Sequence, residues 1–157
     1  MSEDQDKIHV VTRNRKARHN FEIVSTIEAG IELMGTEVKS IREGKINLTD
    51  SYALVESGQV YLKNLHITPY SMASGTPIDP TRPRRLLLHK REIGKLKVKI
   101  EQRGMTLIPL TVYFKGKHVK IELALAVGRR KFDKRQTIAK QEANRRIKQA
   151  LRKETGK

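Results

Sequence analysis

Lysine and arginine are the residues of this sequence whose number and spacing point to chemistry, and that chemistry is ion pairing with phosphate groups. The chain has 33 Lys and Arg against 17 Asp and Glu, a formal net charge of +16. Three internal clusters carry part of this excess. They are residues 13–18, the set Lys39, Arg42 and Lys45, and the set Arg82, Arg84 and Arg85. Several such clusters on one chain favour nucleic acid as the partner.

The largest concentration of positive charge lies in residues 128–157. This segment has twelve Lys or Arg and three Asp or Glu, so it holds +9 of the +16. Its apolar residues are too few and too small to form a core, so nothing offsets the entropy of ordering it alone. Ile138, Ile147 and Leu151 nevertheless follow a helical stripe. We expect a cationic tail that becomes a helix only against an anionic partner.

The polar residues form no recognisable catalytic or metal-binding motif. The five histidines include no pair at zinc-binding spacing and no HExxH, and the absence of cysteine removes thiolate sites. The glycines form neither a phosphate loop nor a dinucleotide fingerprint, and no serine lies in a G-x-S-x-G setting. We therefore expect a protein that is not an enzyme and that holds no cofactor and no metal.

Length and composition fit one compact domain of about 115–125 residues with a sparse tail. The lack of cysteine suits a reducing compartment. The polar start, residues 1–7, has no apolar run of a signal peptide, and no stretch approaches the roughly 20 apolar residues of a membrane span. We expect a cytoplasmic monomer with no membrane partner.

The first half of the chain predicts strands around a short helix. The basic stretch 12–19 leads into a strand that begins at Phe21, in which Gly30 is expected to mark a bulge. A helix is expected over 36–42, capped by Thr36 and ended by Gly44. Its cations, Lys39, Arg42 and Lys45, fall off the buried face and stay available for phosphates.

The remainder predicts two hairpins and a second helix. Residues 51–56 and 59–63 flank one turn, and residues 105–114 and 118–127 flank the other. The last arm alternates strictly. Its inward residues are expected to be Val119, Ile121, Leu123, Leu125 and Val127. Pro109 indicates an edge or a bulge. Residues 71–85 are expected to form a surface loop and residues 86–104 a helix.

Long strands with intervening helices favour a closed β-barrel of the oligonucleotide-binding (OB) type, because closure removes exposed strand edges. The expected fold class is mainly β with helices (α+β), with two or three helices embedded in an OB-like barrel. The expected domains are a flexible leader over 1–12, the barrel over 13–127 and the basic tail over 128–157. The tail is expected to be disordered when free and helical when bound.

Six strings of the sequence together resemble one family. They are NRKARH (14–19), EAGI (28–31), GTEVKSIR (35–42), GKINLTDSY (44–52), LLLHK (86–90) and DKR (133–135). In this order, from about residue 13 to 153, they resemble the SmpB family of small bacterial proteins, which bind transfer-messenger RNA (tmRNA) and rescue stalled ribosomes in trans-translation.

The resemblance implies a non-catalytic barrel with two RNA-facing surfaces. One surface binds the tRNA-like domain of tmRNA and replaces its missing anticodon arm. The matching positions are Asn14, Glu28, Leu88 and Lys120. The nearby basic residues Lys39, Arg42 and Lys45 are added to them. The other surface and the tail are expected in the ribosome's decoding centre and empty mRNA channel. The positions there are His19, Asp133, Lys134, Arg135, Ile138, Lys140, Arg145, Arg146 and Ile147.

The partners implied by the resemblance are tmRNA, the ribosome with its small-subunit rRNA and, indirectly, elongation factor Tu with alanyl-tmRNA. The tail departs from the family pattern at three positions, Ala139, Gln141 and Ala143, which weakens the expected grip. The alternative function is a generic single-stranded nucleic-acid-binding OB-fold protein. That function needs aromatic stacking platforms, and three Phe, four Tyr and no Trp make them scarce.

Overall fold

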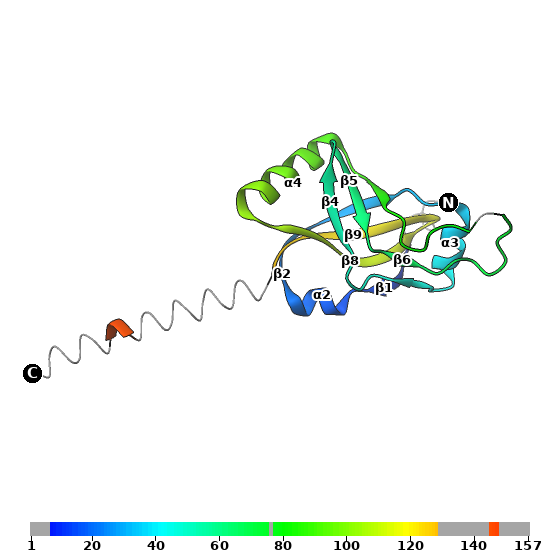
Figure 1. Cartoon of the computed structure of the whole chain (residues 1–157), viewed down its shortest axis with the longest axis horizontal. Helices are drawn as coiled ribbons and strands as arrows, with labels where there is room; N and C mark the ends of the chain where they lie inside the picture. The colour runs from blue at the N-terminus through cyan, green and yellow to red at the C-terminus, as the bar shows by residue number, and fades with distance from the viewer. Residues whose placement is uncertain (1–6, 76, 129–144, 148–157) are drawn as a thin grey trace, which may run out of the picture.

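A computed structural model describes residues 7–75, 77–128 and 145–147 of the chain, and the described residues up to Gly128 fold around one barrel (Figure 1). The strands are β1 Ile8–Arg13, β2 Phe21–Ile31, β3 Ile46–Asn47, β4 Tyr52–Glu56, β5 Gln59–Lys63, β6 His66–Ile67, β7 Arg84–Leu87, β8 Thr106–Lys115 and β9 His118–Gly128. The helices of the barrel region are α2 Arg15–Asn20, α3 Gly35–Arg42 and α4 Lys90–Arg103.

The main sheet closes on itself. Its strand order is β1-β8-β4-β5-β7-β2-β9, and β8 also pairs with β9, so six strands form a ring and β1 pairs with β8 outside it. The ring is only partly closed, because β4 meets β8 at one residue pair and β2 meets β7 at two. The predicted mainly β fold with a barrel and embedded helices is confirmed, and β3 and β6 add a small separate sheet.

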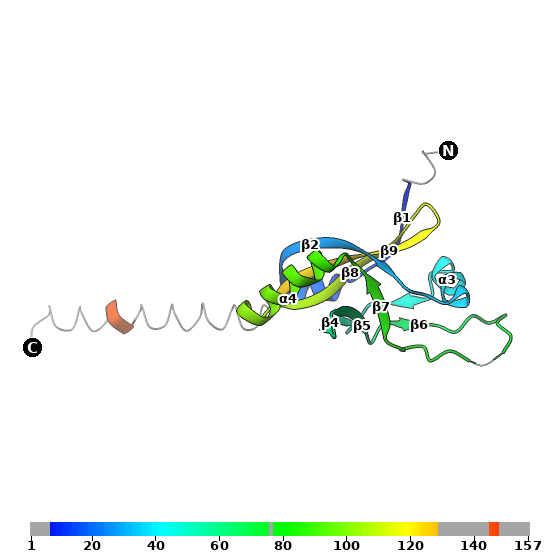
Figure 2. The ribbon, with the colours of Figure 1, turned by 90° about the horizontal axis from the view of Figure 1, so that it is seen from above.

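A long antiparallel ladder between β2 and β9 crosses the barrel (Figure 2). It runs from the pair Phe21 and Gly128 to the pair Gly30 and Lys120. At about 3.3 Å per residue, the steps from Phe21 to Gly30 span about 30 Å. The bulge in β2 lies between Ile23 and Ser25 rather than at the predicted Gly30. Gly30 is needed for a different reason, since an added Cβ would lie 3.2 Å from Leu87 Cβ.

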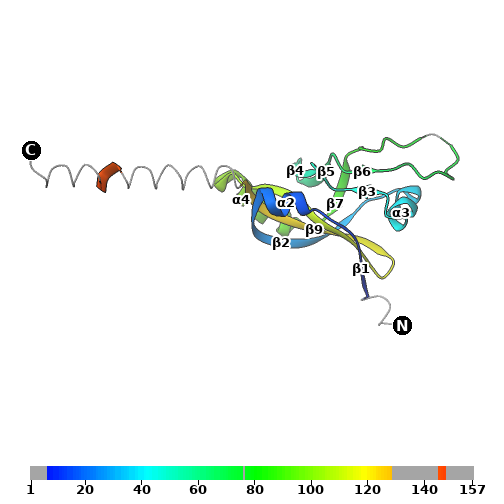
Figure 3. The same ribbon diagram turned by 90° about the horizontal axis from the view of Figure 1, so that it is seen from below.

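Two apolar clusters hold the fold. The larger one fills the barrel with side chains from every strand of the ring, including Val60, Leu86, Leu107 and Ile121. The predicted inward residues of β9 are buried as expected, apart from the half-buried Val127. The smaller cluster lies on the outer face of β8 and β9. It contains Ala17, Ile108, Leu110, Ala124 and Ala126. Helix α2 covers this outer face, so one end of the β8–β9 hairpin is buried on both sides (Figure 3).

Helices α3 and α4 lie at opposite ends of the barrel (Figures 1 and 2). Helix α3 begins after Met34, whose backbone N–H donates to the Glu37 carboxylate at 2.9 Å, so Glu37 and not the predicted Thr36 satisfies this end. Gly44 follows the helix with φ +76°, as predicted. Helix α4 ends at Gly104 in the left-handed conformation (φ 62°), and Ile93 and Leu96 are its buried residues.

Three sequence predictions are wrong in their boundaries. Residues 8–13 form β1, which pairs with β8 outside the ring, so strand structure begins within the segment predicted as a flexible leader. Residues 15–20 form a helix, where the sequence predicted only a basic stretch leading into a strand. The segment predicted as one helix over 86–104 starts as strand β7, because Leu86 pairs with Val60 and is fully buried in the barrel. No helix in the described ranges is long and apolar enough to cross a membrane.

Candidate nucleic-acid interface

A groove of about 610 Å³ lies between β2, β9 and the connection from β7 to α4. Three of the four positions taken from the resemblance line it, namely Glu28, Leu88 and Lys120. Register brings them together: Gly30 of β2 pairs with Lys120 on one side and with Leu87 on the other. The close packing of β7 at Gly30 therefore sets the width of the groove.

The carboxylate of Glu28 is held by two side chains of β8, the strand beyond β9 in the sheet. The hydroxyl of Tyr113 donates a hydrogen bond to it, and Lys115 Nζ lies 3.4 Å away. The bond from Tyr113, helped by the charges of Lys115 and Lys120, keeps the pKa of Glu28 below its ordinary value. Burial and the bond to Glu28 raise the pKa of Tyr113. Glu28 is thus an anion held in place by β8, and its side chain is 38% exposed.

The side chains of Lys120 and Leu88 differ in their contacts with the rest of the protein. Lys120 is half-buried, and its side chain makes no hydrogen bond or ion pair with any described residue, although its charge acts on Glu28. Leu88 is half-buried and packs against the main core. The groove therefore offers an ammonium group free to meet a phosphate and an apolar edge that a ribose or base can contact.

The rim of the groove adds three basic side chains that the sequence analysis did not assign to the site. Arg85, His89 and Lys90 line it, and all three are exposed. Arg85 pairs with Glu32 at 2.9 Å, whereas Lys90 has no ion-pair partner among the described residues. The sequence string Leu86–Lys90 contains most of these positions. It was predicted to be helical, but it includes the connection between β7 and α4, and this connection places the side chains at the groove.

The cations of α3 are exposed as predicted, but they do not line the groove. Lys39 Nζ lies 5.5 Å from the centre of the Tyr70 ring, and the Arg42 guanidinium lies 5.6 Å from that of Phe114. Phe114 is a core residue near the end of β8, so Arg42 lies beside that end of the strand. Lys45 pairs with Glu43 at 3.3 Å on the surface.

Arg84, a member of the third basic cluster, is not available to a partner. Its side chain is fully buried, with Nε 2.7 Å from the Glu37 carboxylate and Nη1 2.7 Å from the Leu65 carbonyl. Burial lowers the pKa of Arg84, and Glu37 acts against this effect. Burial also opposes the charged form of Glu37, but bonds from Arg82, Met34 and Arg84 outweigh it and keep its pKa below the ordinary value. This network ties the 68–83 loop and α3 to the barrel.

Asn14, the fourth position taken from the resemblance, does not lie in the groove. Only 4% of its surface is exposed, and both ends of its side-chain amide are bonded within the protein. A direct contact between this side chain and RNA, as predicted, conflicts with that burial. The sequence string that contains Asn14 carried no indication that its amide points inward.

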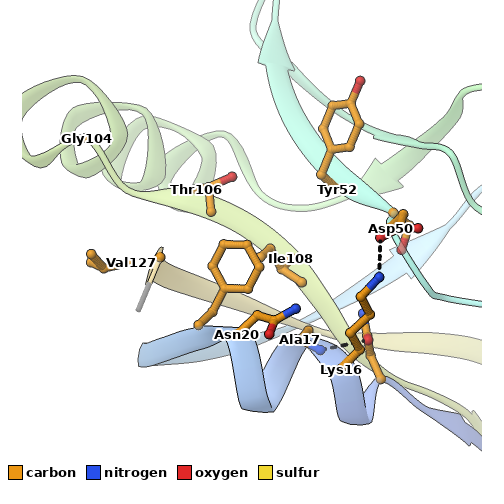
Figure 4. Close-up of a pocket in the computed structure, with 13 residues that line it drawn as sticks. Lys16, Ala17, Asn20, Asp50, Tyr52, Gly104, Thr106, Ile108 and Val127 are labelled. Carbon is orange, nitrogen blue, oxygen red and sulfur yellow. Dashed lines mark hydrogen bonds and ion pairs between the residues drawn. The ribbon is translucent and has the colours of Figure 1, made fainter. Parts of the chain in front are cut away.

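A second hollow, of about 530 Å³, lies at the opposite end of the β2–β9 ladder, under α2 (Figure 4). It lies between α2, the start of β8 and the end of β9, and Lys16 and Asp50 form an ion pair at 3.2 Å across its rim. His19 is exposed in the last turn of α2, two residues before β2 begins. His19 and the root of the tail therefore lie about 30 Å from the groove.

Most of the predicted tail contacts lie outside the described residues. These are Asp133, Lys134, Arg135, Ile138 and Lys140. Arg145, Arg146 and Ile147 are helical and exposed. In the part of the chain that the structure describes, no group of three or more His, Asp or Glu side chains is placed to hold a metal ion.

Comparisons with known proteins agree with this arrangement. The family model described as "SmpB protein" matches residues 11–153. A similar relative is the SsrA-binding protein of Halothermothrix orenii, 56% identical over 148 residues that cover 94% of this chain and 96% of the relative. Another is the SsrA-binding protein of Chlorobaculum tepidum, 53% identical over 157 residues that cover 98% and 99%.

A solved structure gives the same result for the barrel. A chain from "tmRNA-SmpB: a journey to the center of the bacterial ribosome" is 52% identical, with a TM-score of 0.63, and the match covers 74% of this chain and 82% of that one. The family match includes both the groove and the tail positions. On these grounds the chain belongs to the SmpB family.

Proposed function

We propose that this protein binds the tRNA-like domain of tmRNA through the groove and delivers tmRNA to stalled ribosomes. The observation that carries the proposal is the convergence of Glu28, Leu88 and Lys120 on one groove with cationic side chains on its rim. The family membership and the relatives named as SsrA-binding proteins support it. The protein acts by binding and positioning RNA, and it catalyses no reaction.

Each groove residue has a distinct task in this proposal. Lys120 and Lys90 pair with backbone phosphates, and Lys39, Arg42 and Lys45 extend the cationic surface along α3. The carboxylate of Glu28 accepts a hydrogen bond from a base amino group, for which Tyr113 holds it in place. Leu88 packs against a base or a ribose. A folded RNA can meet both the groove and α3 without further ordering, whereas a flexible single strand loses conformational entropy when it does so.

The far end of the β2–β9 ladder is proposed to face the ribosome. His19 contacts a decoding-centre nucleotide of small-subunit rRNA, and the tail from residue 128 enters the empty mRNA channel as a helix. The cations and apolar residues of the tail hold it there, with Arg145, Arg146 and Ile147 among them. The protein works as a monomer in the cytoplasm, together with elongation factor Tu carrying alanyl-tmRNA.

Binding of generic single strands is less compatible with the surface. Base stacking by OB-fold proteins uses exposed aromatic side chains. Among the described residues, every Phe and Tyr is buried or half-buried. The barrel therefore lacks the open aromatic platform that the alternative function requires in this part of the chain.

A competition gel shift tests the proposal. The tRNA-like domain of tmRNA should displace a labelled copy of itself far better than a single-stranded oligomer of equal charge does. With four to eight phosphate contacts, log affinity should fall against log salt with a slope of about −3 to −7. Lys120→Glu should weaken binding about tenfold or more, while Lys99→Glu on the exposed side of α4 has the same charge change and should have little effect. Indifference to RNA shape would rule the proposal out.

Truncation separates the two ends of the molecule. A chain ending near Val127 should keep most of its affinity for the tRNA-like domain and lose ribosome rescue, because all described residues that line the groove precede the tail. Rescue is measured as transfer of alanine from tmRNA to a stalled nascent chain. Loss of RNA binding on truncation would show that the tail, and not the groove, supplies the affinity.

A further inference from the structure

The side chain of Asn14 is a buried clasp between three segments. Its Oδ1 accepts a hydrogen bond from the Ala17 N–H at 3.1 Å, which caps α2. Its Nδ2 donates to the Leu48 carbonyl at 3.3 Å and to the Pro109 carbonyl at 3.1 Å. The backbone N–H of Asn14 also donates to the Leu110 carbonyl at 2.7 Å. The segments joined are α2, the connection from β3 to β4, and β8.

The chemistry of this position calls for an amide. The register between β8 and β9 shifts between Pro109 and Thr111, and the bulge turns the Pro109 carbonyl out of the regular ladder. A buried carbonyl needs a donor, and the start of a helix needs an acceptor. Asparagine alone among side chains of this size supplies one acceptor and two donors. Aspartate would cap the helix but would place a carboxylate oxygen against two carbonyls.

Helix α2 depends on this clasp. It has six residues, too few to be stable without tertiary support. Two of its side chains make ion pairs, Lys16 with Asp50 and Arg18 with Glu122, but all four partners are substantially exposed and such pairs add little. Ala17 is the only buried residue of the helix itself. The clasp at Asn14 and the packing of Ala17 therefore fix where α2 lies, and His19 is in its last turn.

We propose that Asn14 is a positioning residue for α2, and that through α2 it sets the orientation of His19 toward the ribosome, rather than contacting tmRNA. This inference rests on the proposed function of the α2 end. It assigns Asn14 to a role at the α2 end of the barrel, whereas Glu28, Leu88 and Lys120 keep their role in binding RNA at the groove. Loss of the clasp should impair the ribosomal step and leave the groove unchanged.

The experiment compares Asn14→Asp, Asn14→Ala and Ala17→Gly in the full-length protein. Amide hydrogen exchange of α2 reports the clasp itself, and exchange should speed up about five- to tenfold in α2 while β7 and the start of β9 keep wild-type rates. Affinity for the tRNA-like domain should stay within about twofold of wild type. Alanine transfer on stalled ribosomes should fall about tenfold or more, toward the level of His19→Ala. Ala17→Gly leaves the amide intact and should reproduce the same pattern.

Two controls make the result decisive. Leu96→Val in α4 lowers global stability away from α2, and it should leave both rescue and α2 exchange at wild-type levels. Wild-type protein that fails to bind the tRNA-like domain would defeat the proposed function itself. If wild type binds and rescues, the positioning role is overturned by Asn14 or Ala17 variants that loosen α2 yet rescue normally. It is also overturned if folded Asn14 variants lose RNA affinity about tenfold or more while Ala17→Gly does not. Should the Asn14 variants not fold, Ala17→Gly alone decides whether a loosened α2 impairs rescue.

Discussion

Replacing Arg84 by methionine should destabilise the barrel severely, although the residue belongs to a cluster that looks like an RNA-binding surface in the sequence. Methionine has a similar length and no charge, so the change removes the guanidinium while filling much of the same space. Arg84 is fully buried, its Nη2 lies 2.5 Å from Glu37, and it also bonds to the carbonyls of Leu65 and Pro80. The variant leaves all three acceptors without this donor.

The magnitude follows from burial. Removing one partner of a buried ion pair costs about 3–5 kcal/mol, because the other charge stays buried without compensation. Arg82 and the Met34 N–H still bond to Glu37 and limit this loss. Two carbonyls left without a donor add about 1–3 kcal/mol each where water cannot reach them. Because the remaining bonds to Glu37 offset part of these terms, we expect a total loss of at least about 3–5 kcal/mol, which is a large share of the roughly 5–15 kcal/mol that stabilises a domain of this size.

Urea unfolding followed by far-ultraviolet circular dichroism measures this loss. Arg85→Met is the matched control: it is the next residue of β7, its side chain is 43% exposed, and its pair with Glu32 should contribute about 1 kcal/mol or less. A second substitution, Glu37→Leu, placed on Arg84→Met should cost less than it does on wild type, because the orphaned carboxylate is gone. A loss below about 1 kcal/mol for Arg84→Met would refute the reasoning about the buried pair.

Three further predictions follow from single contacts. The pKa of Glu37 is lower in the folded protein than its ordinary value of 4.5, so its contribution is complete above that pH and is lost as the pH falls through the lower folded value. Urea midpoints should therefore drop from about pH 5 to about pH 3 in wild type and less steeply in Glu37→Gln. Gly104→Ala forces φ 62° on a residue with a Cβ and should lower the unfolding free energy by about 1 kcal/mol, whereas Gly94→Ala in the same helix should not lower it. Gly30→Ala should push Leu87 away from β2, weaken binding of the tRNA-like domain and cost about 1–3 kcal/mol; unchanged affinity and stability would mean that the groove adapts.

Much of the barrel was predictable because its signals are local. The alternation of β9, the turn at Lys115–Lys117 and the glycine after α3 each predict the structure that is found. The segment from Leu86 was not predictable in this way, since three leucines suit a helix or a strand. Its conformation is decided by Val60, which pairs with Leu86 from a strand 26 residues earlier in the chain. Long-range pairing overrides local preference here.

The residues of the candidate site also divide into those that local sequence predicts and those that long-range packing decides. Lys39 is exposed and Lys120 is half-buried with its side chain outside the core, as their spacing predicts, because a cation at the surface needs no particular partner. Arg84 and Asn14 could not be sorted from their neighbours, since the bonding groups of their partners are mainly backbone carbonyls with no side-chain identity. Whether a basic or amide side chain points inward depends on the register of strands distant in sequence. Sequence patterns therefore locate the charged surface better than they identify its members.

The β2–β9 ladder has a consequence for how this protein can vary in length. Neighbouring residues of a strand face opposite sides, so inserting one residue would turn every later side chain from the core to solvent. A regular stretch of the ladder therefore lengthens by pairs of residues, about 7 Å at a time, and a single extra residue needs a bulge such as the one between Ile23 and Ser25. The distance from Lys120 in the groove to Gly128, where the tail begins, therefore changes in steps of two residues wherever the ladder is regular. A homologue working on a ribosome of slightly different dimensions would have to adjust in its tail, where length can change one residue at a time.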